Sequence, residues 1–207
     1  MADPGHSPLP PRTPTSETGL RIMEVARDII SEAGLDGLKA RIVAKAAGTS
    51  VGTLYNTFGP IEDLVRLINA ETYNDLHRVQ SEALAQARAD ALPPTAQLHA
   101  LAESYLAWVE THQRQWQATL SYNRARKTAP PDWYAARERD LLDIVVDALG
   151  GFGSGLSEDE LGFHARALWA SIHGIVTMAV GNGFWLQPAD DVRAQMALVI
   201  DAVADQL

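Results

Sequence analysis

The sequence predicts an all-α fold of about nine helices, arranged in two helical domains. Apolar residues recur with a period of about 3.6 residues along most of the chain, which is the spacing of one face of a helix. Glycine and proline fall between these periodic segments, where helices end and begin. No stretch shows the alternation of apolar and polar residues that is typical of a half-buried strand. With 207 residues, of which 46% are hydrophobic, the chain is long enough to bury a core.

The composition limits which kinds of site and which cellular compartment we expect for the protein. The chain has no cysteine, so it can form neither a disulfide nor a thiolate metal site. Residues 1–16 are rich in proline and lack the apolar run of a signal peptide, so we expect a disordered tail there. No stretch reaches the roughly 18 apolar residues of a membrane span. We therefore expect a cytoplasmic protein with no membrane contact.

Three helices are expected after this tail. The first spans residues 17–33. The second spans residues 39–47 and ends at Gly48, because glycine readily takes the positive φ that a helix end requires. The hydroxyl of Ser50 can then accept a hydrogen bond from the free N–H groups of a third helix, at residues 50–57. Two short helices joined in this way form a helix-turn-helix.

The third helix has two different faces. Its apolar face carries residues at i, i+3, i+4 and i+7, which are Val51, Leu54, Tyr55 and Phe58. Its outward face carries small, uncharged residues, which are Gly52, Thr53, Asn56 and Thr57. Such a face suits a helix lying in the major groove of DNA, where base edges offer hydrogen-bond donors and acceptors.

A long helix is expected next. Pro60 suits the first position of a helix, because its missing N–H would have no partner there. Nothing interrupts the helix before Pro93, so it can extend over about 30 residues, or about 45 Å. We place the domain boundary inside this helix, near Tyr73. The expected domains are therefore residues 17–73 and 74–207.

The second domain is expected to contain five more helices. Their apolar stripes place them at residues 95–112, 113–122, 131–149, 157–181 and 190–207. The glycine-rich stretch between the third and fourth of these follows a helix rather than a strand, so it is interpreted as a linker and not as a nucleotide-binding loop. The last helix is apolar almost all round, so something should cover its outer side. We expect a two-fold homodimer built on the last two helices.

The charge distribution is uneven. The net charge is 17 minus 26, or −9, which argues against a polyanionic partner. Residues 1–60 nevertheless balance six basic against six acidic residues, so the remainder carries the whole negative charge. Lys39, Arg41 and Lys45 lie close together beside the helix-turn-helix, where they favour contact with phosphates.

Residues 44–58, which read AKAAGTSVGTLYNTF, resemble the signature of the tetracycline-repressor (TetR) family. The family pattern is Ala-x-x-Ala-Gly-(Val)-Ser-x-Gly-Thr-Leu-Tyr-x-(His/Tyr)-Phe. The resemblance implies a transcriptional regulator whose N-terminal helices bind DNA. It implies base contacts by Gly52, Thr53 and Asn56, phosphate contacts by Ser50 and Tyr55, and a position near a base or sugar for Val51. With Thr57 and the three cations, the predicted DNA-binding set is Lys39, Arg41, Lys45, Ser50, Val51, Gly52, Thr53, Tyr55, Asn56 and Thr57.

Two positions depart from the family pattern. Leu38 and Lys39 stand where the second helix of the family usually begins with Thr, which leaves that cap and its phosphate contact in question. After Phe58 the family usually has Ser-Lys-Glu, whereas this chain continues Gly-Pro-Ile-Glu and lacks the lysine.

The sequence lacks the spacings of common catalytic sites. It contains no Glu-x-x-His pair of a di-iron bundle, no His-Glu-x-x-His and no phosphate-binding loop. We therefore expect a protein that is not an enzyme and that uses no metal or other cofactor.

The second domain carries the candidates for a ligand site. Trp169, His173 and Gly174 form Trp-x-x-x-His-Gly, which resembles the signature of a C-terminal domain type of some TetR-family regulators. An alternative of equal weight is that His173 is a core histidine packed on Trp169. Interiors of helical bundles are also where such folds bind ligands, here hydrophobic or aromatic ones. The candidate pocket residues are Tyr105, Trp108, Trp116, Tyr122, Trp169 and His173.

The sequence thus predicts a dimeric, sequence-specific regulator that binds a double-stranded DNA operator, interpreted as a repressor released by a small hydrophobic or aromatic effector. One rival is a helical ligand-binding protein or enzyme that has kept the fold but lost DNA binding. Ile61 and the missing threonine favour this rival, and a gel shift with the chain's own upstream DNA separates the two. A second rival is an adaptor that binds a partner through the long helix. A Tyr55→Ala variant that bound its target normally would favour the adaptor.

Overall fold

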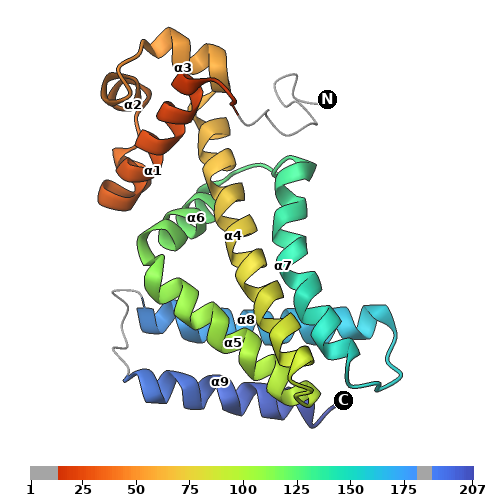
Figure 1. Ribbon diagram of the computed structural model, residues 1–207. Coiled ribbons are helices and arrows are strands. Elements are labelled where there is room, and N and C mark those ends of the chain that lie inside the picture. Colours follow the sequence, from red (N-terminus) through yellow and green to blue (C-terminus); the bar gives the residue numbers. More distant parts are fainter. Residues whose placement is uncertain (1–13, 181–187) are drawn as a thin grey trace. The chain divides into compact units, whose positions relative to one another are not determined.

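Nine α-helices and no strand make up the residues that the structure describes, which are 14–180 and 188–207 of this computed structural model (Figure 1). The predicted all-α fold is confirmed. Most of the tail predicted over residues 1–16 lies outside the described residues. The helices begin and end within a few residues of their predicted limits.

Contacts within the chain divide it into two compact units. The first unit is Met1–Asn74 together with Arg114–Arg137, and the second is Asp75–Gln113 together with Glu138–Leu207. The boundary after Asn74 lies inside the long helix, close to the expected position. The division nevertheless differs from the expected domains, because residues 114–137 pack with the first unit although they follow a part of the second.

The helix-turn-helix lies in the first unit. α1 spans Glu17–Gly37, α2 spans Ala40–Ala46 and α3 spans Val51–Phe58. Ser16 caps α1, since its hydroxyl accepts a hydrogen bond from the N–H of Gly19 at 3.1 Å. The buried core beneath these helices and the start of the next includes Ile22, Met23, Ala26, Ile30, Val43, Leu54, Phe58, Leu64 and Ile68.

Gly34 interrupts α1 at the position where the sequence predicts its end. Its φ of 66° and ψ of −169° lie outside helical geometry, and glycine adopts such a φ at little cost. The chain then makes one further turn to Gly37, which the N–H of Leu38 closes by donating to the carbonyl of Leu35 at 3.0 Å. The helix therefore extends past residue 33 across a kink.

Side-chain hydrogen bonds hold residues 114–137 in the first unit. α4 spans Ile61–Ala89, α6 spans Gln113–Ala125 and α7 spans Asp132–Gly150. In α4, the amide of Asn69 donates to the hydroxyl of Tyr134 at 3.2 Å and accepts from Thr119 at 3.1 Å. Both atoms of this buried amide are therefore satisfied by the two later helices.

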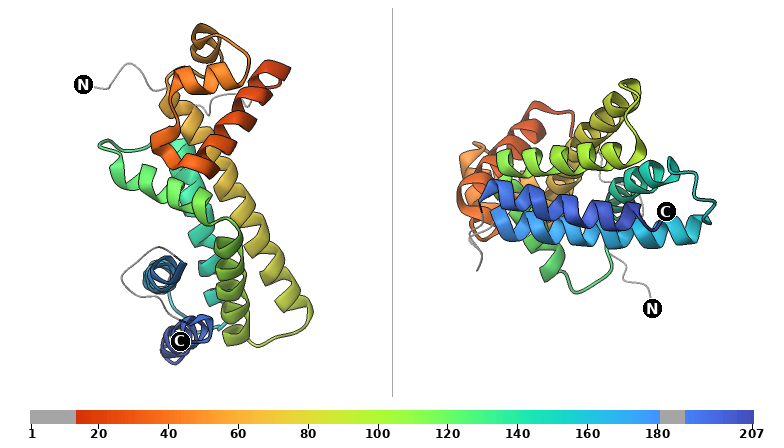
Figure 2. Two further views of the ribbon diagram at one scale, coloured as in Figure 1. Left: turned by 90° about the vertical axis from the view of Figure 1, so that its left-hand side faces the viewer. Right: turned by 90° about the horizontal axis from the view of Figure 1, so that it is seen from below.

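The second unit is a bundle formed by the end of α4, most of α7 and three further helices. α5 spans Pro94–Thr111, α8 spans Glu158–Val180 and α9 spans Ala189–Ala204. α8 and α9 run side by side in opposite directions, and Figure 2 shows the pair end-on and from below. α5 packs on both of them.

A capping box starts α8. The carboxylate of Glu160 accepts hydrogen bonds from the N–H of Ser157 at 2.9 Å and from its hydroxyl at 2.7 Å. These bonds lower the pKa of Glu160 below its ordinary value, because they favour the charged carboxylate.

Two negative findings apply to the described part of the chain. It contains no helix with the length and apolar character needed to cross a membrane. It also contains no group of three or more His, Cys, Asp or Glu side chains that could hold a metal ion.

Candidate functional site

A tight turn fixes the start of α3. Gly48 has a φ of 67° and donates its N–H to the carbonyl of Lys45, while Thr49 donates to the carbonyl of Ala44 at 2.9 Å. This pair of bonds is the Schellman arrangement that closes a helix end. α2 therefore ends at the residue where the sequence predicts its end.

Ser50 caps α3 as predicted. Its backbone is extended, with φ −88° and ψ 154°, and its hydroxyl accepts from the N–H of Thr53 at 3.0 Å. The hydroxyl groups of Ser50 and Thr53 also lie 2.9 Å apart and share a hydrogen bond. The first turn of α3 is therefore ordered by its own side chains.

The two faces of α3 differ in burial. Leu54 is fully buried and Phe58 is nearly so, which anchors the helix on α1 and α2. The exposed side presents residues of the predicted outward face, which are Gly52, Asn56 and Thr57, with Thr53 half-buried. The hydroxyl of Thr57 donates to the carbonyl of Thr53 at 2.8 Å, so its oxygen is left to accept.

Tyr55 lies outside the buried stripe to which the sequence pattern assigned it. Its side chain is 47% exposed, whereas Val51 is half-buried. One residue advances a helix by about 100°, so Tyr55 turns away from Leu54 to the edge of the stripe. Because the buried stripe of α3 is narrow, Tyr55 lies on the same exposed side of the helix as Asn56.

The three predicted cations are exposed beside α3. Lys39 precedes α2 and provides no side-chain cap, and Arg41 and Lys45 lie on the exposed surface of α2. None of the three takes part in an ion pair among the described residues. Their charges are therefore available to an external anion, in contrast to that of Arg27, which pairs with Glu71 at 3.0 Å.

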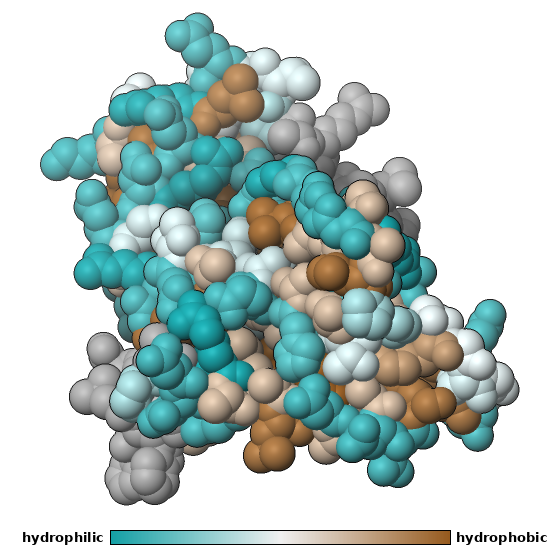
Figure 3. Space-filling model, turned by 60° about the horizontal axis from the view of Figure 1, so that its bottom comes forward, coloured by the Kyte–Doolittle hydropathy of each residue, from teal (hydrophilic) through white to brown (hydrophobic). Residues whose placement is uncertain are grey.

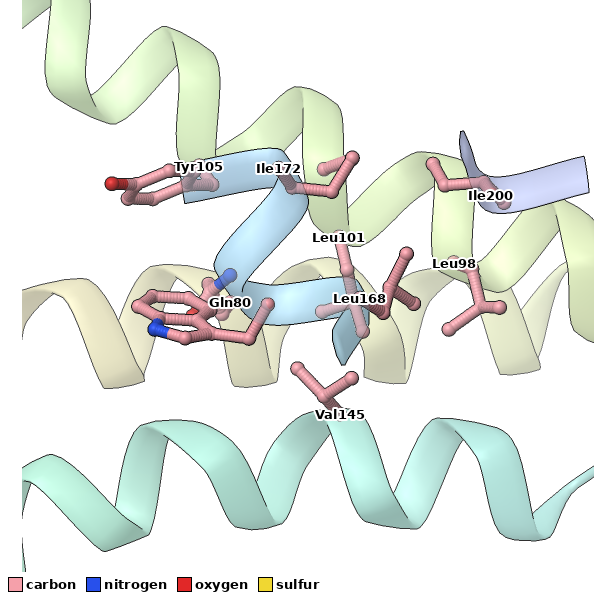
Figure 4. Close-up of a pocket in the computed structure, with 10 residues that line it drawn as sticks. Gln80, Leu98, Leu101, Tyr105, Val145, Leu168, Ile172 and Ile200 are labelled. Carbon is pink, nitrogen blue, oxygen red and sulfur yellow. The ribbon is translucent and has the colours of Figure 1, made fainter. Parts of the chain in front are cut away.

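A small, partly open cavity lies in the second unit. It measures about 30 Å³ and lies among α4, α5, α7, α8 and α9 (Figure 4). Its apolar lining consists of Leu98, Leu101, Ala102, Val145, Leu168, Ile172 and Ile200. The remaining lining residues are Gln80, Tyr105 and Trp169.

Two of the predicted pocket aromatics line this cavity, and a third touches them. The hydroxyl of Tyr105 lies 2.7 Å from Nδ1 of His173, and the ring of Trp169 stacks on that imidazole with centroids 5.8 Å apart. Burial lowers the pKa of His173, because it disfavours the charged imidazolium. The three aromatic side chains form one hydrogen-bonded and stacked group at an edge of the cavity.

The other predicted pocket residues lie elsewhere. The indole N–H of Trp108 donates to the carboxylate of Asp75 at 2.8 Å, and its ring stacks on His112 rather than lining the cavity. This hydrogen bond is the largest of the effects that lower the pKa of Asp75 below its ordinary value.

Trp116 and Tyr122 belong to the first unit. The Tyr122 hydroxyl accepts from Nε of Arg66 at 2.7 Å, and Trp116 packs edge-on against Tyr73. Burial raises the pKa of Tyr122, because it disfavours the phenolate. The structure therefore does not bring these two aromatics together with the cavity.

Gln80 is the cavity residue that the sequence-based set omits. It is 2% exposed and lies in the buried stripe of α4, four residues after Leu76 and four before Leu84. A polar residue inside an apolar stripe is the signal that could have identified it, because such residues are rarely buried without a partner.

Comparisons with known proteins agree in the fold and in both parts of the chain. The family model described as "Bacterial regulatory proteins, tetR family" matches residues 22–68, and the one described as "Tetracyclin repressor-like, C-terminal domain" matches residues 98–203. An uncharacterized HTH-type transcriptional regulator of Mycobacterium tuberculosis is 25% identical over 158 residues, which are 76% of this chain and 67% of that protein.

Two solved structures illustrate the similarity of fold. A protein of unknown function from Rhodococcus sp. RHA1 is 20% identical with a TM-score of 0.72, covering 100% of this chain and 99% of its own. The transcriptional regulator FadR from Bacillus subtilis, in complex with stearoyl-CoA, is 17% identical with a TM-score of 0.67, covering 91% and 98%. The Trp-x-x-x-His-Gly type of C-terminal domain stays a prediction.

Proposed function

The chain belongs to the tetR family of bacterial regulatory proteins and is a DNA-binding transcriptional regulator, and we propose that it is a repressor that a small, largely apolar ligand releases from its operator. It would act in the cytoplasm, as a homodimer, and without catalysis or a cofactor. The observation that supports the proposal best is the exposed face of α3, whose opposite side is anchored by Leu54 and Phe58 in a buried core.

The exposed face of α3 has the chemistry of a DNA reader. Asn56 carries an amide, which can contact an adenine edge with both its donor and its acceptor. Gly52 has no side chain, and a Cβ there would meet only the hydroxyl of Ser50 at 3.6 Å, so another molecule can approach the backbone closely. Lys39, Arg41 and the Tyr55 hydroxyl would hold phosphates and set the register of the helix.

An apolar face of α8 and α9 supports the homodimer. Phe163 is 64% exposed and Met178 is 52% exposed, and the residues at helical spacing between them are small. On α9, Leu198 is 71% exposed. Figure 3 shows apolar side chains reaching the surface among hydrophilic ones. We propose that two copies bury these residues against each other, which would present two α3 helices to half-sites about 34 Å apart or a multiple of this.

Release by a ligand follows from this symmetric arrangement. A ligand that binds better to a conformation in which the two α3 helices no longer match the half-sites lowers the affinity for DNA. It must favour that conformation by several kcal/mol to empty the operator. A similar regulator, FadR, has been seen with stearoyl-CoA, and we propose a ligand site in the second unit of this chain, at the cavity beside Tyr105 and Trp169.

The test of DNA binding uses a fluorescent fragment from upstream of the chain's own gene. We expect Asn56→Ala to weaken binding about tenfold or more, because one good bidentate base contact contributes about 1–3 kcal/mol. Asn74→Ala is the matched control, since Asn74 is an exposed asparagine of α4. Equal binding by Asn56→Ala and wild type would contradict the assigned face, and failure of the wild type to bind this or any selected genomic fragment would contradict the proposed function.

The test of the dimer is sedimentation equilibrium of Leu198→Asp. A carboxylate in a buried apolar interface is costly, so we expect the variant to be monomeric at micromolar concentration and to lose DNA binding with it. Asp201→Asn changes an exposed carboxylate on the same helix and serves as the control. A dimeric Leu198→Asp variant would place the interface elsewhere.

A further inference from the structure

Gln80 carries a buried amide in the second unit. Its side chain is 2% exposed, and its Oε1 has no hydrogen-bond partner among the described residues. It lines the cavity described above (Figure 4). A buried acceptor without a donor destabilises the folded state, because it has lost its hydrogen bonds to water.

Nothing in the packing of α4 requires an amide at this position. Leu76 and Leu84 precede and follow Gln80 by one turn each, and both are buried. A leucine at position 80 would continue this stripe with no polar atom to satisfy. The amide therefore lowers the stability of the empty form, which points to a molecule that satisfies it when the cavity is occupied.

The rest of the lining restricts the chemistry of that molecule. Among the described residues, no Lys, Arg, His, Asp or Glu lines the cavity, so none of them would balance a buried carboxylate or ammonium there. The Tyr105 hydroxyl is already bonded to His173 at 2.7 Å. The acceptor of Gln80 is thus the polar group that a ligand would meet first.

We infer that the cavity binds a neutral, largely apolar small molecule with one N–H or O–H group, which donates a hydrogen bond to Oε1 of Gln80. The inference rests on the proposed ligand-responsive function and specifies the class of ligand. Gln80 is then a specificity-determining residue. It distinguishes between ligands of similar shape, because only those with an N–H or O–H group can donate to its Oε1.

The size of the cavity sets how the ligand enters. A volume of about 30 Å³ has room for little more than a water molecule. An aromatic ring must therefore displace side chains of the lining, and the occupied form differs in packing from the form described here. Such repacking is what a ligand needs in order to favour one conformation of the second unit over another.

Two pairs of probes with matched shapes test the inference. Pyrrole and indole carry an N–H group, whereas furan and benzofuran have nearly the same shapes and carry none. We expect at least one N–H probe to bind about tenfold more tightly than its partner by isothermal titration calorimetry, because a hydrogen bond to a buried acceptor is gained. In Gln80→Leu the ratio should fall to about one, since both members of a pair then meet only apolar groups.

The controls separate specificity from folding. Gln80→Leu should raise the melting temperature of the free protein, whereas a residue needed only for the fold would lower it. Gln80→Met, which keeps the length of the side chain, gives the same test if the leucine variant does not fold. Gln86→Leu replaces an exposed glutamine of the same helix and should keep the wild-type ratio.

Three outcomes would overturn the inference. They are binding of none of the four probes up to millimolar concentration, equal binding within both pairs, and a ratio that persists in Gln80→Leu. Each preparation is also assayed for binding to the upstream DNA. Normal DNA binding with any of these outcomes removes the ligand class and leaves the proposed regulator intact, whereas loss of DNA binding in the wild type removes the proposed function itself.

Discussion

Two buried amides, that of Asn69 in the first unit and that of Gln80 in the second, differ in how their polar atoms are satisfied. In the first unit, Asn69, Thr72 and Thr119 are at most 1% exposed, and each is hydrogen-bonded. Thr72 donates to the carbonyl of Ile68 and accepts from Gln115 at 2.7 Å. In the second unit, Gln80 is equally buried but its Oε1 has no partner among the described residues, and a cavity lies beside it.

This difference matches what each unit has to do. The satisfied amide of Asn69 joins α4 to α6 and α7, and buried hydrogen bonds of this kind favour a single arrangement of the helices that they join. Recognising a ligand by repacking requires a region with unfilled space and an unsatisfied group. The proposed response to a ligand is therefore assigned to the surroundings of Gln80 and not to those of Asn69.

The largest expected effect comes from Asn69→Leu. This change removes two buried hydrogen bonds, one to Thr119 and one to Tyr134, so we expect a loss of about 2–3 kcal/mol in the free energy of unfolding. Thr119 keeps its bond to the carbonyl of Gln115, and Tyr134 keeps its bond to Asn123. The opposite sign is expected for the same substitution type at Gln80. Urea denaturation followed by tryptophan fluorescence measures both, and Asn74→Leu, at an exposed position of the same helix, should change little. A stable Asn69→Leu variant would remove the contrast between the two units.

A smaller effect is expected from adding volume at one buried alanine in each unit. Ala44 is 1% exposed in the core under α3, where a valine has no space, so Ala44→Val should cost about 1–3 kcal/mol. Ala102 lines the cavity, so Ala102→Val should fill part of it and stabilise the protein by about 0.5–1 kcal/mol. The same valine should weaken binding of indole. Destabilisation by both valines in thermal melts would show that the second unit is packed as tightly as the first.

Local features of the fold could be predicted from the sequence because they depend on neighbouring residues. Ser50 caps α3, Gly48 ends α2 and Gly34 interrupts α1, and each of these acts within one helical turn. The helical stripes follow from the same short spacing. The exposed face of α3 was predicted for this reason, although Tyr55 is exposed at the edge of the buried stripe to which the pattern assigned it.

Long-range pairings could not be predicted in this way. Thr119 and Asn69 are 50 residues apart in the sequence, and no local pattern shows that they bond and so join α6 to the first unit. The same contacts take Trp116 and Tyr122 away from the cavity. A search for aromatic residues selects large rings. It does not select Gln80, whose amide is a polar group among the mostly apolar residues that line the cavity.

The smallest expected effect is a change in the free energy of unfolding with pH, which arises in the second unit. The described histidines all lie in the second unit, and burial lowers the pKa of His173 there. The unfolded chain, with a histidine pKa of about 6.5, then binds the proton more tightly than the folded chain does. The stability that the neutral imidazole contributes is complete above this pH and is lost as the pH falls through it toward the lower pKa of the folded state.

We therefore expect the free energy of unfolding to fall between pH 7.5 and 5.5, by at most about 1.4 kcal/mol from this group. His173→Asn should flatten this part of the pH profile, because its amide can still face the Tyr105 hydroxyl but does not titrate. His77→Gln removes another imidazole of the same unit and serves as the control. An unchanged slope in His173→Asn would mean that His173 is protonated as easily in the folded protein as in the unfolded chain. The aromatic group at the edge of the cavity would then be open to water. Water could then also reach Gln80, and the contrast between the satisfied amide of Asn69 and the unsatisfied amide of Gln80 would fail at this point.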